Sequence, residues 1–143
     1  MIELALLVVS FIAMEGVAWF THKFIMHGVL WSWHEDHHRP TQTRFEKNDL
    51  FFLVFAIPSV ILIFMGSMNG ITYSFFIGMG IAIYGLCYFL VHDVLIHRRF
   101  KWFDHTTNAY FRAIRKAHKI HHKSNKKEEG RYFGMLWVPK DLK

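Results

Sequence analysis

Three long apolar stretches dominate the pattern of hydrophobic and polar positions along the chain. The first covers residues 2–22, and the other two, residues 49–66 and 71–92, are separated by the short turn GSMNG. Residues 50–91 contain no charged side chain. Because a helix needs about 20 apolar residues to cross the core of a bilayer, the pattern predicts three membrane-spanning helices. Pro58 is expected to kink the second span without breaking it.

The first apolar stretch is expected to stay in the mature protein. It has neither the basic leading segment nor the small-residue cleavage site that a secretory signal peptide carries. At 143 residues, 52% of them hydrophobic, the chain has room for one domain. The predicted fold class is therefore an all-α integral membrane bundle of about three to four spans, formed by a single domain over residues 1–143.

The basic residues predict the orientation of this bundle. All 17 Lys and Arg residues lie outside the three predicted spans, in the segments that follow the first and the third span. With three spans these segments lie on one side of the membrane, which the positive-inside rule makes cytoplasmic, and the N-terminus lies outside. The net charge of +6 thus indicates membrane topology. No nucleic-acid partner is expected, because no recognition module accompanies the charge.

Ten of the eleven histidines fall into four short motifs beyond one end of the predicted spans. Two motifs have the spacing H-x-x-x-x-H and two have H-x-x-H-H. In chain order the motifs contain His22 and His27; His34, His37 and His38; His92 and His97; and His118, His121 and His122. The remaining histidine, His105, belongs to no motif and is expected to be structural.

The spacing within each motif predicts where its side chains point. On an α-helix the residues i, i+3 and i+4 share one face, so each H-x-x-H-H motif directs three imidazoles into one volume. Residues five apart diverge by roughly 140°, so each H-x-x-x-x-H pair is expected to reach opposite sides of a cavity, or two metals. Ten imidazoles exceed the ligands of one tetrahedral zinc and suit two metals with four or five nitrogen ligands each. Imidazole alone does not identify the metal.

The segment HEDHH, residues 34–38, also has a different interpretation. It fits the H-E-x-x-H signature of zinc metalloproteases, in which Glu35 would be the general base. A membrane metalloprotease would leave most of the histidines without a role. A non-enzymatic metal carrier or sensor is a further alternative, but it would be expected to place its ligands along a transmembrane path.

The last histidine motif lies on a predicted amphipathic helix, residues 105–123, at the membrane interface. Phe111 and Ile114 share the face of its histidines, and the basic residues lie away from that face. The predicted bundle therefore carries a histidine-rich, two-metal cap on its cytoplasmic side.

Four other polar residues are candidates to orient the ligands, because a metal-bound histidine usually donates its second N–H to a carboxylate or carbonyl. They are Glu15, Asn48, Asp49 and Asp93. Glu15 lies within the first span, seven residues before His22 and on the same helical face. An ionisable residue in a span usually serves the bundle interior. Glu15 could therefore support a metal ligand, take part in a proton relay or make a purely structural hydrogen bond.

Six segments together resemble the β-carotene 3-hydroxylases of carotenoid-producing bacteria, which belong to the fatty acid hydroxylase and membrane desaturase superfamily. The segments are, in order, THKFIMHG, WSWHEDHH, FEKNDL, YFLVHDVLIHRRF, AHKIHH and YFGMLW, within residues 17–139. The resemblance implies that the ten histidines of the motifs are the ligands of two iron ions. Glu35 and Asp36 stand where the family pattern leaves the residue open, so no role carries over to them.

The resemblance also implies the reaction and its partners. Such an enzyme uses O2 and two electrons from reduced ferredoxin or a similar donor to hydroxylate carbon 3 of each β-ionone ring of β-carotene, giving β-cryptoxanthin and then zeaxanthin. The carotenoid and the lipid bilayer are the other expected partners, and a bacterial inner membrane is the expected location. Within the superfamily the alternatives are a carotenoid ketolase and a sterol or fatty acid hydroxylase or desaturase.

Overall fold

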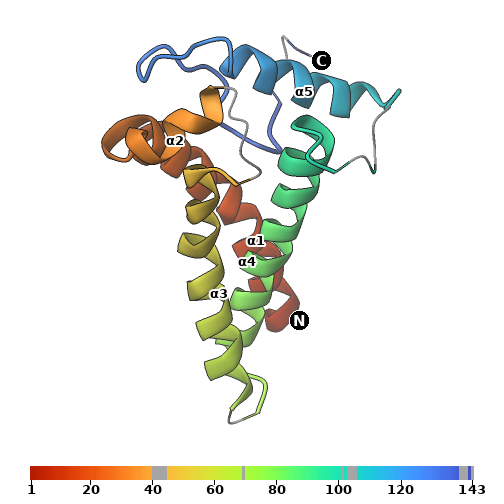
Figure 1. The fold of residues 1–143 in the computed structure, drawn as a ribbon. Coiled ribbons are helices and arrows are strands. Elements are labelled where there is room, and N and C mark those ends of the chain that lie inside the picture. Colours follow the sequence, from red (N-terminus) through yellow and green to blue (C-terminus); the bar gives the residue numbers. More distant parts are fainter. Residues whose placement is uncertain (40–44, 69, 101, 103–105, 139–141, 143) are drawn as a thin grey trace.

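The computed structural model describes residues 1–39, 45–68, 70–100, 102, 106–138 and 142, and the regular elements in this part of the chain are helices. In order they are α1 (Ile2–Phe20), η1 (Thr21–Val29), α2 (Trp31–His38), η2 (Lys47–Leu50), α3 (Phe51–Ser67), α4 (Tyr73–Phe89), η3 (Leu90–Ile96) and α5 (Ala109–His121) (Figure 1). The predicted all-α fold class is confirmed.

Three continuous helical segments are long and apolar enough to cross a membrane. They are Ile2–Val29, Lys47–Ser67 and Tyr73–Ile96, and at most 17% of the residues in the apolar window of each are buried within the protein. Exposed apolar side chains such as Leu4, Val60 and Phe64 are unfavourable in water, whereas lipid accommodates them. The chain is therefore an integral membrane protein with three candidate spans, as the apolar pattern predicts.

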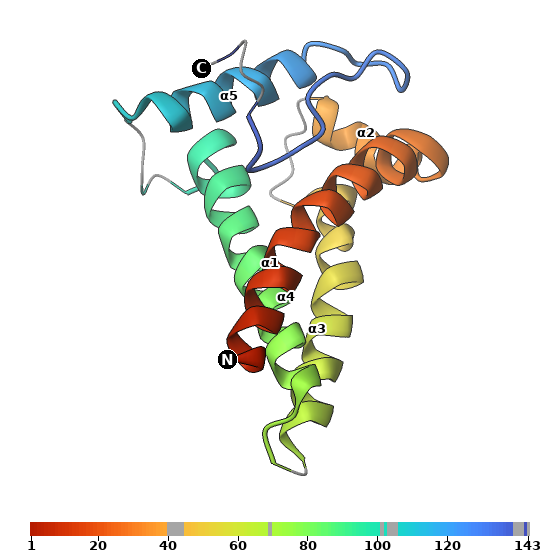
Figure 2. The same ribbon diagram turned by 180° about the vertical axis from the view of Figure 1, so that it is seen from behind.

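The spans form a narrow bundle with a cap across one end (Figures 1 and 2). α3 and α4 lie side by side as an antiparallel hairpin, and α1 packs against α4. α2, α5 and the segment after α5 lie across the end at which α1 and α4 finish. The turn between α3 and α4 lies at the opposite end. Every motif histidine is thereby brought to the capped end.

Close contact between the spans depends on small residues. A Cβ atom on Gly80 would clash with Oγ of Ser10 on α1, and one on Gly78 would lie 2.9 Å from the backbone oxygen of Ser59 on α3. The hydroxyl of Ser59 donates to the carbonyl oxygen of Gly78 at 2.8 Å. Small residues that let helix backbones approach closely are typical of membrane helix interfaces. α3 continues through Pro58 as one helix.

Two helices change from α to π geometry where the H-x-x-x-x-H motifs occur. α1 continues as the π-helical η1, which carries His22 and His27, and α4 continues as the π-helical η3, which carries His92. The N–H of His97 donates to the carbonyl oxygen of His92 at 2.9 Å, which is a bond between residues five apart. In this geometry residues five apart lie one above the other, and such segments occur frequently at functional sites.

The predicted interfacial helix corresponds to α5, which is shorter than expected. It begins after Asn108, whose side-chain oxygen accepts from the N–H groups of Tyr110 and Phe111, a favourable N-cap. His118 and Ile114 are buried, but Phe111 is exposed although it was predicted on the histidine face. His105, together with the predicted start of this helix, lies outside the described residues.

Candidate metal centre

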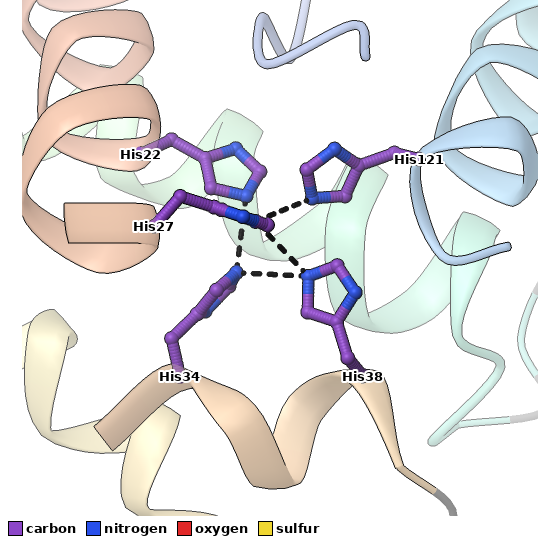
Figure 3. A group of neighbouring side chains, drawn as sticks. All are labelled: His22, His27, His34, His38 and His121. Carbon is purple, nitrogen blue, oxygen red and sulfur yellow. Dashed lines mark hydrogen bonds between the residues drawn. The ribbon is translucent and has the colours of Figure 1, made fainter. Parts of the chain in front are cut away.

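Five histidines from three helical segments form one buried cluster, called here the five-histidine cluster (Figure 3). Its members are His22 and His27 on η1, His34 and His38 on α2, and His121 at the end of α5. All five side chains are buried, and one ligand atom from each lies within 4.8 Å of the others. Segments almost a hundred residues apart therefore contribute to one small volume.

The Nε2 atoms of this cluster point toward one another. Nε2 of His27 lies 3.1 Å from Nε2 of His38 and 3.1 Å from Nε2 of His121. Nε2 of His34 lies 3.2 Å from Nε2 of His22 and 3.2 Å from Nε2 of His38. Two nitrogens bound at right angles to one ion at about 2.1 Å would be about 3 Å apart. The separations in the cluster are those expected of ligands to a single ion.

The Nδ1 atoms of the same histidines contact oxygen acceptors. The pairs are His22 with the carbonyl oxygen of Phe133, His27 with that of Lys127, His38 with that of Ser124, and His121 with that of Arg131, at 2.9 or 3.0 Å. A carbonyl oxygen cannot donate, so each of these Nδ1 atoms carries the proton and each Nε2 presents a lone pair. Converging lone pairs in a buried volume repel one another. A cation at their centre would remove that repulsion.

Burial keeps these imidazoles neutral. It lowers the pKa of His34 to about 2, that of His121 to about 3 and that of His38 to about 4. The unprotonated imidazole is the form that binds metal. The cluster is thus in the ligand state at neutral pH.

A second group, called here the four-histidine cluster, lies beside the first. It contains His37, His97, His118 and His122, with one ligand atom of each within 4.8 Å of the others. Nε2 of His97 lies 2.9 Å from Nε2 of His118. Nε2 of His122 is buried and, among the described residues, has no hydrogen-bond partner. A buried nitrogen without a partner is unfavourable, and a metal ion would satisfy it.

His92 completes the second group. Its Nε2 lies 3.0 Å from Nε2 of His37, and its ring lies 4.5 Å from that of His97. The two clusters are adjacent, since the rings of His38 and His122 stack at 4.5 Å. All ten motif histidines therefore gather in one region with room for two metal ions. The nitrogen-only donor set suits a transition metal.

The structure differs from the expectation that each H-x-x-x-x-H pair reaches opposite sides of a cavity, or two metals, because both members of each pair lie in or beside one cluster. His22 and His27 both belong to the five-histidine cluster, and His92 and His97 both lie beside His37. The prediction assumed α-helical geometry, whereas the π-helical segments bring residues five apart onto one side.

Instead, each H-x-x-H-H motif divides between the clusters. On α2, His34 and His38 face the five-histidine cluster and His37 faces the other. On α5, His118 and His122 face the four-histidine cluster and His121 faces the first. In both motifs the pair four residues apart stays together, because one turn separates its members on the same side of the helix. α2 and α5 therefore each join the two clusters.

Of the four predicted supporting residues, two contact a histidine. Oδ1 of Asn48 lies 2.7 Å from Nδ1 of His34, and Oδ2 of Asp93 lies 3.4 Å from Nδ1 of His92. Within the part of the chain that the structure describes, the carboxylate of Asp49 contacts no histidine. Its carboxylate accepts from the backbone N–H of Glu46 at 3.0 Å and caps η2.

The carboxylate of Glu15 accepts hydrogen bonds from the C-terminal segment and from α4 and, among the described residues, contacts no histidine. Its Oε1 accepts from the backbone N–H groups of Met135, Leu136 and Trp137, each at 2.9 Å, and its Oε2 accepts from the hydroxyl of Tyr84 at 2.8 Å. These bonds hold the C-terminal segment against α1 and α4. The same segment supplies the carbonyl oxygens that orient four of the histidines.

Two charged residues at the site were missed by reasoning from sequence. Oε2 of Glu46 lies 2.8 Å from Nδ1 of His37. The guanidinium of Arg99 contacts Glu46, Asp49 and Asp93 at 2.7 to 3.1 Å. Burial raises the pKa of Glu46, and the charge of Arg99 acts in the opposite direction. The position of Glu46 two residues before Asn48, just ahead of the second apolar stretch, was the available signal.

Glu35 points away from both clusters. Its carboxylate pairs with Arg39 at 2.7 Å, one helical turn further on. Asp36 accepts from the backbone N–H of Lys47 at 2.7 Å. A metalloprotease base must reach the water on its zinc, and a glutamate paired on the outer face of α2 does not. This geometry disfavours the protease interpretation of HEDHH.

A cavity of about 410 Å³ opens beside the five-histidine cluster, between α1 and residues 132–137. Its lining includes Gly16, Trp19, Phe133 and Trp137. The ring of Phe133 also packs against His22, with ring centres 5.4 Å apart. Phe133 therefore forms a shared wall between an apolar cavity and the candidate metal site.

Comparison with known proteins defines the family. The sequence model of the fatty acid hydroxylase family matches residues 7–141, and the chain belongs to this family. The β-carotene hydroxylase of Pseudescherichia vulneris is 43% identical over 96% of this chain and 78% of its own length. That of Pantoea ananas is 43% identical over 92% of this chain and 74% of its own length. The β-carotene hydroxylase of Paracoccus sp. (strain PC1) is 35% identical over 97% of this chain and 86% of its own length.

No solved structure matches the chain. The resemblance seen in the sequence is confirmed by the family match and the relatives, and with it the enzyme class, an oxidoreductase.

Proposed function

We propose that the chain hydroxylates carbon 3 of the β-ionone rings of β-carotene, giving β-cryptoxanthin and then zeaxanthin. The observation that carries the proposal is the convergence of Nε2 lone pairs in two adjacent clusters, one buried and the other partly buried. Relatives named β-carotene hydroxylase, which match nearly the whole chain, support the choice of substrate.

The proposed cofactor is a pair of iron ions, one in each cluster. Bound iron would supply the activation of O2 that oxidation of an unactivated C–H bond requires. For each ring, one C–H bond, O2, two electrons and two protons give one C–OH group and one water. Reduced ferredoxin or a similar donor is the proposed source of the electrons. The histidines hold the ions, and the acceptors at Nδ1 fix their rings.

The substrate is an apolar rod comparable in length to the ~30 Å hydrocarbon core. We place its ring in the cavity beside Trp19 and Phe133 and its polyene along the spans. We also propose that the clusters lie on the cytoplasmic side of a bacterial inner membrane, with the N-terminus outside; the basic segments support this orientation.

Pigment chromatography of β-carotene-producing cells that express the chain tests the proposal, with His38→Gln as the inactive control. The expected result is β-cryptoxanthin as an intermediate and zeaxanthin as the product. Unchanged β-carotene from folded, iron-loaded protein with a reductant present would contradict the proposal. Ketones in place of alcohols would indicate the ketolase alternative.

A further inference from the structure

The two clusters differ in the groups behind their histidines. In the five-histidine cluster every Nδ1 faces a neutral acceptor, either a backbone carbonyl or the amide oxygen of Asn48. At the other cluster the described acceptors are carboxylates, Glu46 for His37 and Asp93 for the adjacent His92. α2 shows the contrast within a single turn, because His34 contacts an amide and His37 contacts a carboxylate.

Arg99 holds these carboxylates in position. Its Nη2 lies 2.9 Å from Oε2 of Glu46, and its Nη1 lies 3.1 Å from Oδ1 of Asp93 and 2.7 Å from Oδ1 of Asp49. Glu46 precedes η2, whereas Asp93 lies on η3. One guanidinium thus joins two separate segments behind one cluster. Three carboxylates around one cation also leave this side negatively charged.

We infer that Glu46 and Arg99 are positioning residues that make the ion of the four-histidine cluster electronically distinct from that of the five-histidine cluster. A carboxylate that accepts from Nδ1–H increases the basicity of the imidazole and hence its donation to a bound metal. A neutral carbonyl or amide acceptor increases the basicity of the imidazole less than a carboxylate does. The ion beside His37 is therefore held by the stronger donors and is better able to carry the higher charge. The inference rests on the proposed two-iron function.

Glu46 and Asn48 offer a matched pair of variants. They lie two residues apart and contact two histidines of the same helix. Glu46→Gln keeps an acceptor oxygen and removes the charge behind His37, whereas Asn48→Asp adds a charge behind His34. Mössbauer spectra of protein reconstituted with ⁵⁷Fe report the two ions separately. The parent should show two doublets of equal area; Glu46→Gln should shift one, and Asn48→Asp should shift the other.

Release of iron to a chelator gives a second readout that does not depend on turnover. Glu46→Gln should release one of its two irons at least ~10-fold faster than the parent protein, which is the lower range for loss of such a supporting group. Unchanged spectra in Glu46→Gln, or a shift of the same doublet in both variants, would overturn the inference. Two distinct irons without any hydroxylated pigment would instead overturn the proposed function alone. Fewer than two irons in the parent would overturn both.

Discussion

Arg99 and His37 contact the same atom, Oε2 of Glu46, at 2.9 and 2.8 Å respectively. The orientation of a histidine on α2 therefore depends on an arginine that follows η3, more than sixty residues away in the sequence. Glu46 lies between them as the acceptor for both. This relationship couples the packing of the loop before α3 to the geometry of the four-histidine cluster.

Arg99→Gln is expected to weaken the binding of one iron by about 10-fold or more, since the carboxylates behind His37 and His92 lose the cation that fixes them. Iron per chain after dialysis against a chelator measures this effect. The neighbouring Arg98, which is exposed, provides the control, and Arg98→Gln should retain both irons. Equal retention in the two variants would show that Arg99 does not position the ligands.

Glu35→Gln tests the protease interpretation of HEDHH. Because Glu35 pairs with Arg39 outside the clusters, the variant should keep its iron and most of its hydroxylase activity. His38→Gln should lose both, since its Nε2 lies within the five-histidine cluster. Product formation and iron content are the measurements. A Glu35→Gln protein that keeps its metal but is more than ~100-fold slower would indicate a general base.

Gly16→Leu tests the cavity as the site of the substrate ring. A Cβ at Gly16 meets no atom within 4 Å, and the residue lines the cavity, so a side chain at this position begins in open space at the cavity. The expected result is a roughly tenfold or greater loss in kcat/KM for β-carotene, with unchanged iron content. Gly85→Leu is the control, because a Cβ at Gly85 also meets no atom within 4 Å, but the residue lies on α4 and does not line the cavity. Similar values of kcat/KM for the two variants would exclude the cavity as the site of the substrate ring.

Glu15→Gln is expected to lower the free energy of unfolding by about 2 kcal/mol, because the bonds that three backbone N–H groups donate to Oε1 lose their charge assistance. Tyr84→Phe should cost less, about 1 kcal/mol, since it removes only the bond to Oε2. Thermal unfolding in detergent measures both. A larger loss in the free energy of unfolding for Tyr84→Phe than for Glu15→Gln would contradict this assignment of the hydrogen bonds.

The metal-free protein should lose stability as the pH falls below about 6.5, the ordinary pKa of histidine. Burial lowers the pKa of His38 to about 4 and that of His121 to about 3. Between pH 6.5 and these values the unfolded chain binds protons that the folded chain does not, so lower pH favours unfolding. The Tm should fall between pH 7 and pH 5. Iron-loaded protein should resist this fall, because bound metal competes with protons for Nε2. A Tm of the metal-free protein that rises toward pH 5 would contradict the buried neutral state.

The sequence was sufficient for the features that depend on local composition. Length and apolarity alone predict three spans, and the spans in turn place all ten motif histidines at one end. The change to π geometry at His22 and His92 could not be predicted, because the spacing of side chains does not report which backbone carbonyl accepts each N–H. That difference reversed the expectation for both H-x-x-x-x-H pairs.

Apart from Asn48 and Asp93, the acceptors behind the histidines could not be predicted from the sequence, for two physical reasons. Every residue has a carbonyl, so nothing in the side chains of Ser124 or Phe133 marks them as partners of His38 and His22. Arg99 and Glu46 are recognisable by charge, but only the folded chain shows that they meet.

Incorporation of oxygen from ¹⁸O2 tests the central claim most directly. Purified, iron-loaded protein in detergent is supplied with β-carotene, a reductant and ¹⁸O2 in ordinary water, and the products are analysed by mass spectrometry. If the two clusters hold the irons of a monooxygenase, each new hydroxyl at carbon 3 carries one ¹⁸O atom, and His38→Gln gives no product. Hydroxyl oxygen derived from water, or product formation by the His38→Gln protein, would contradict the account.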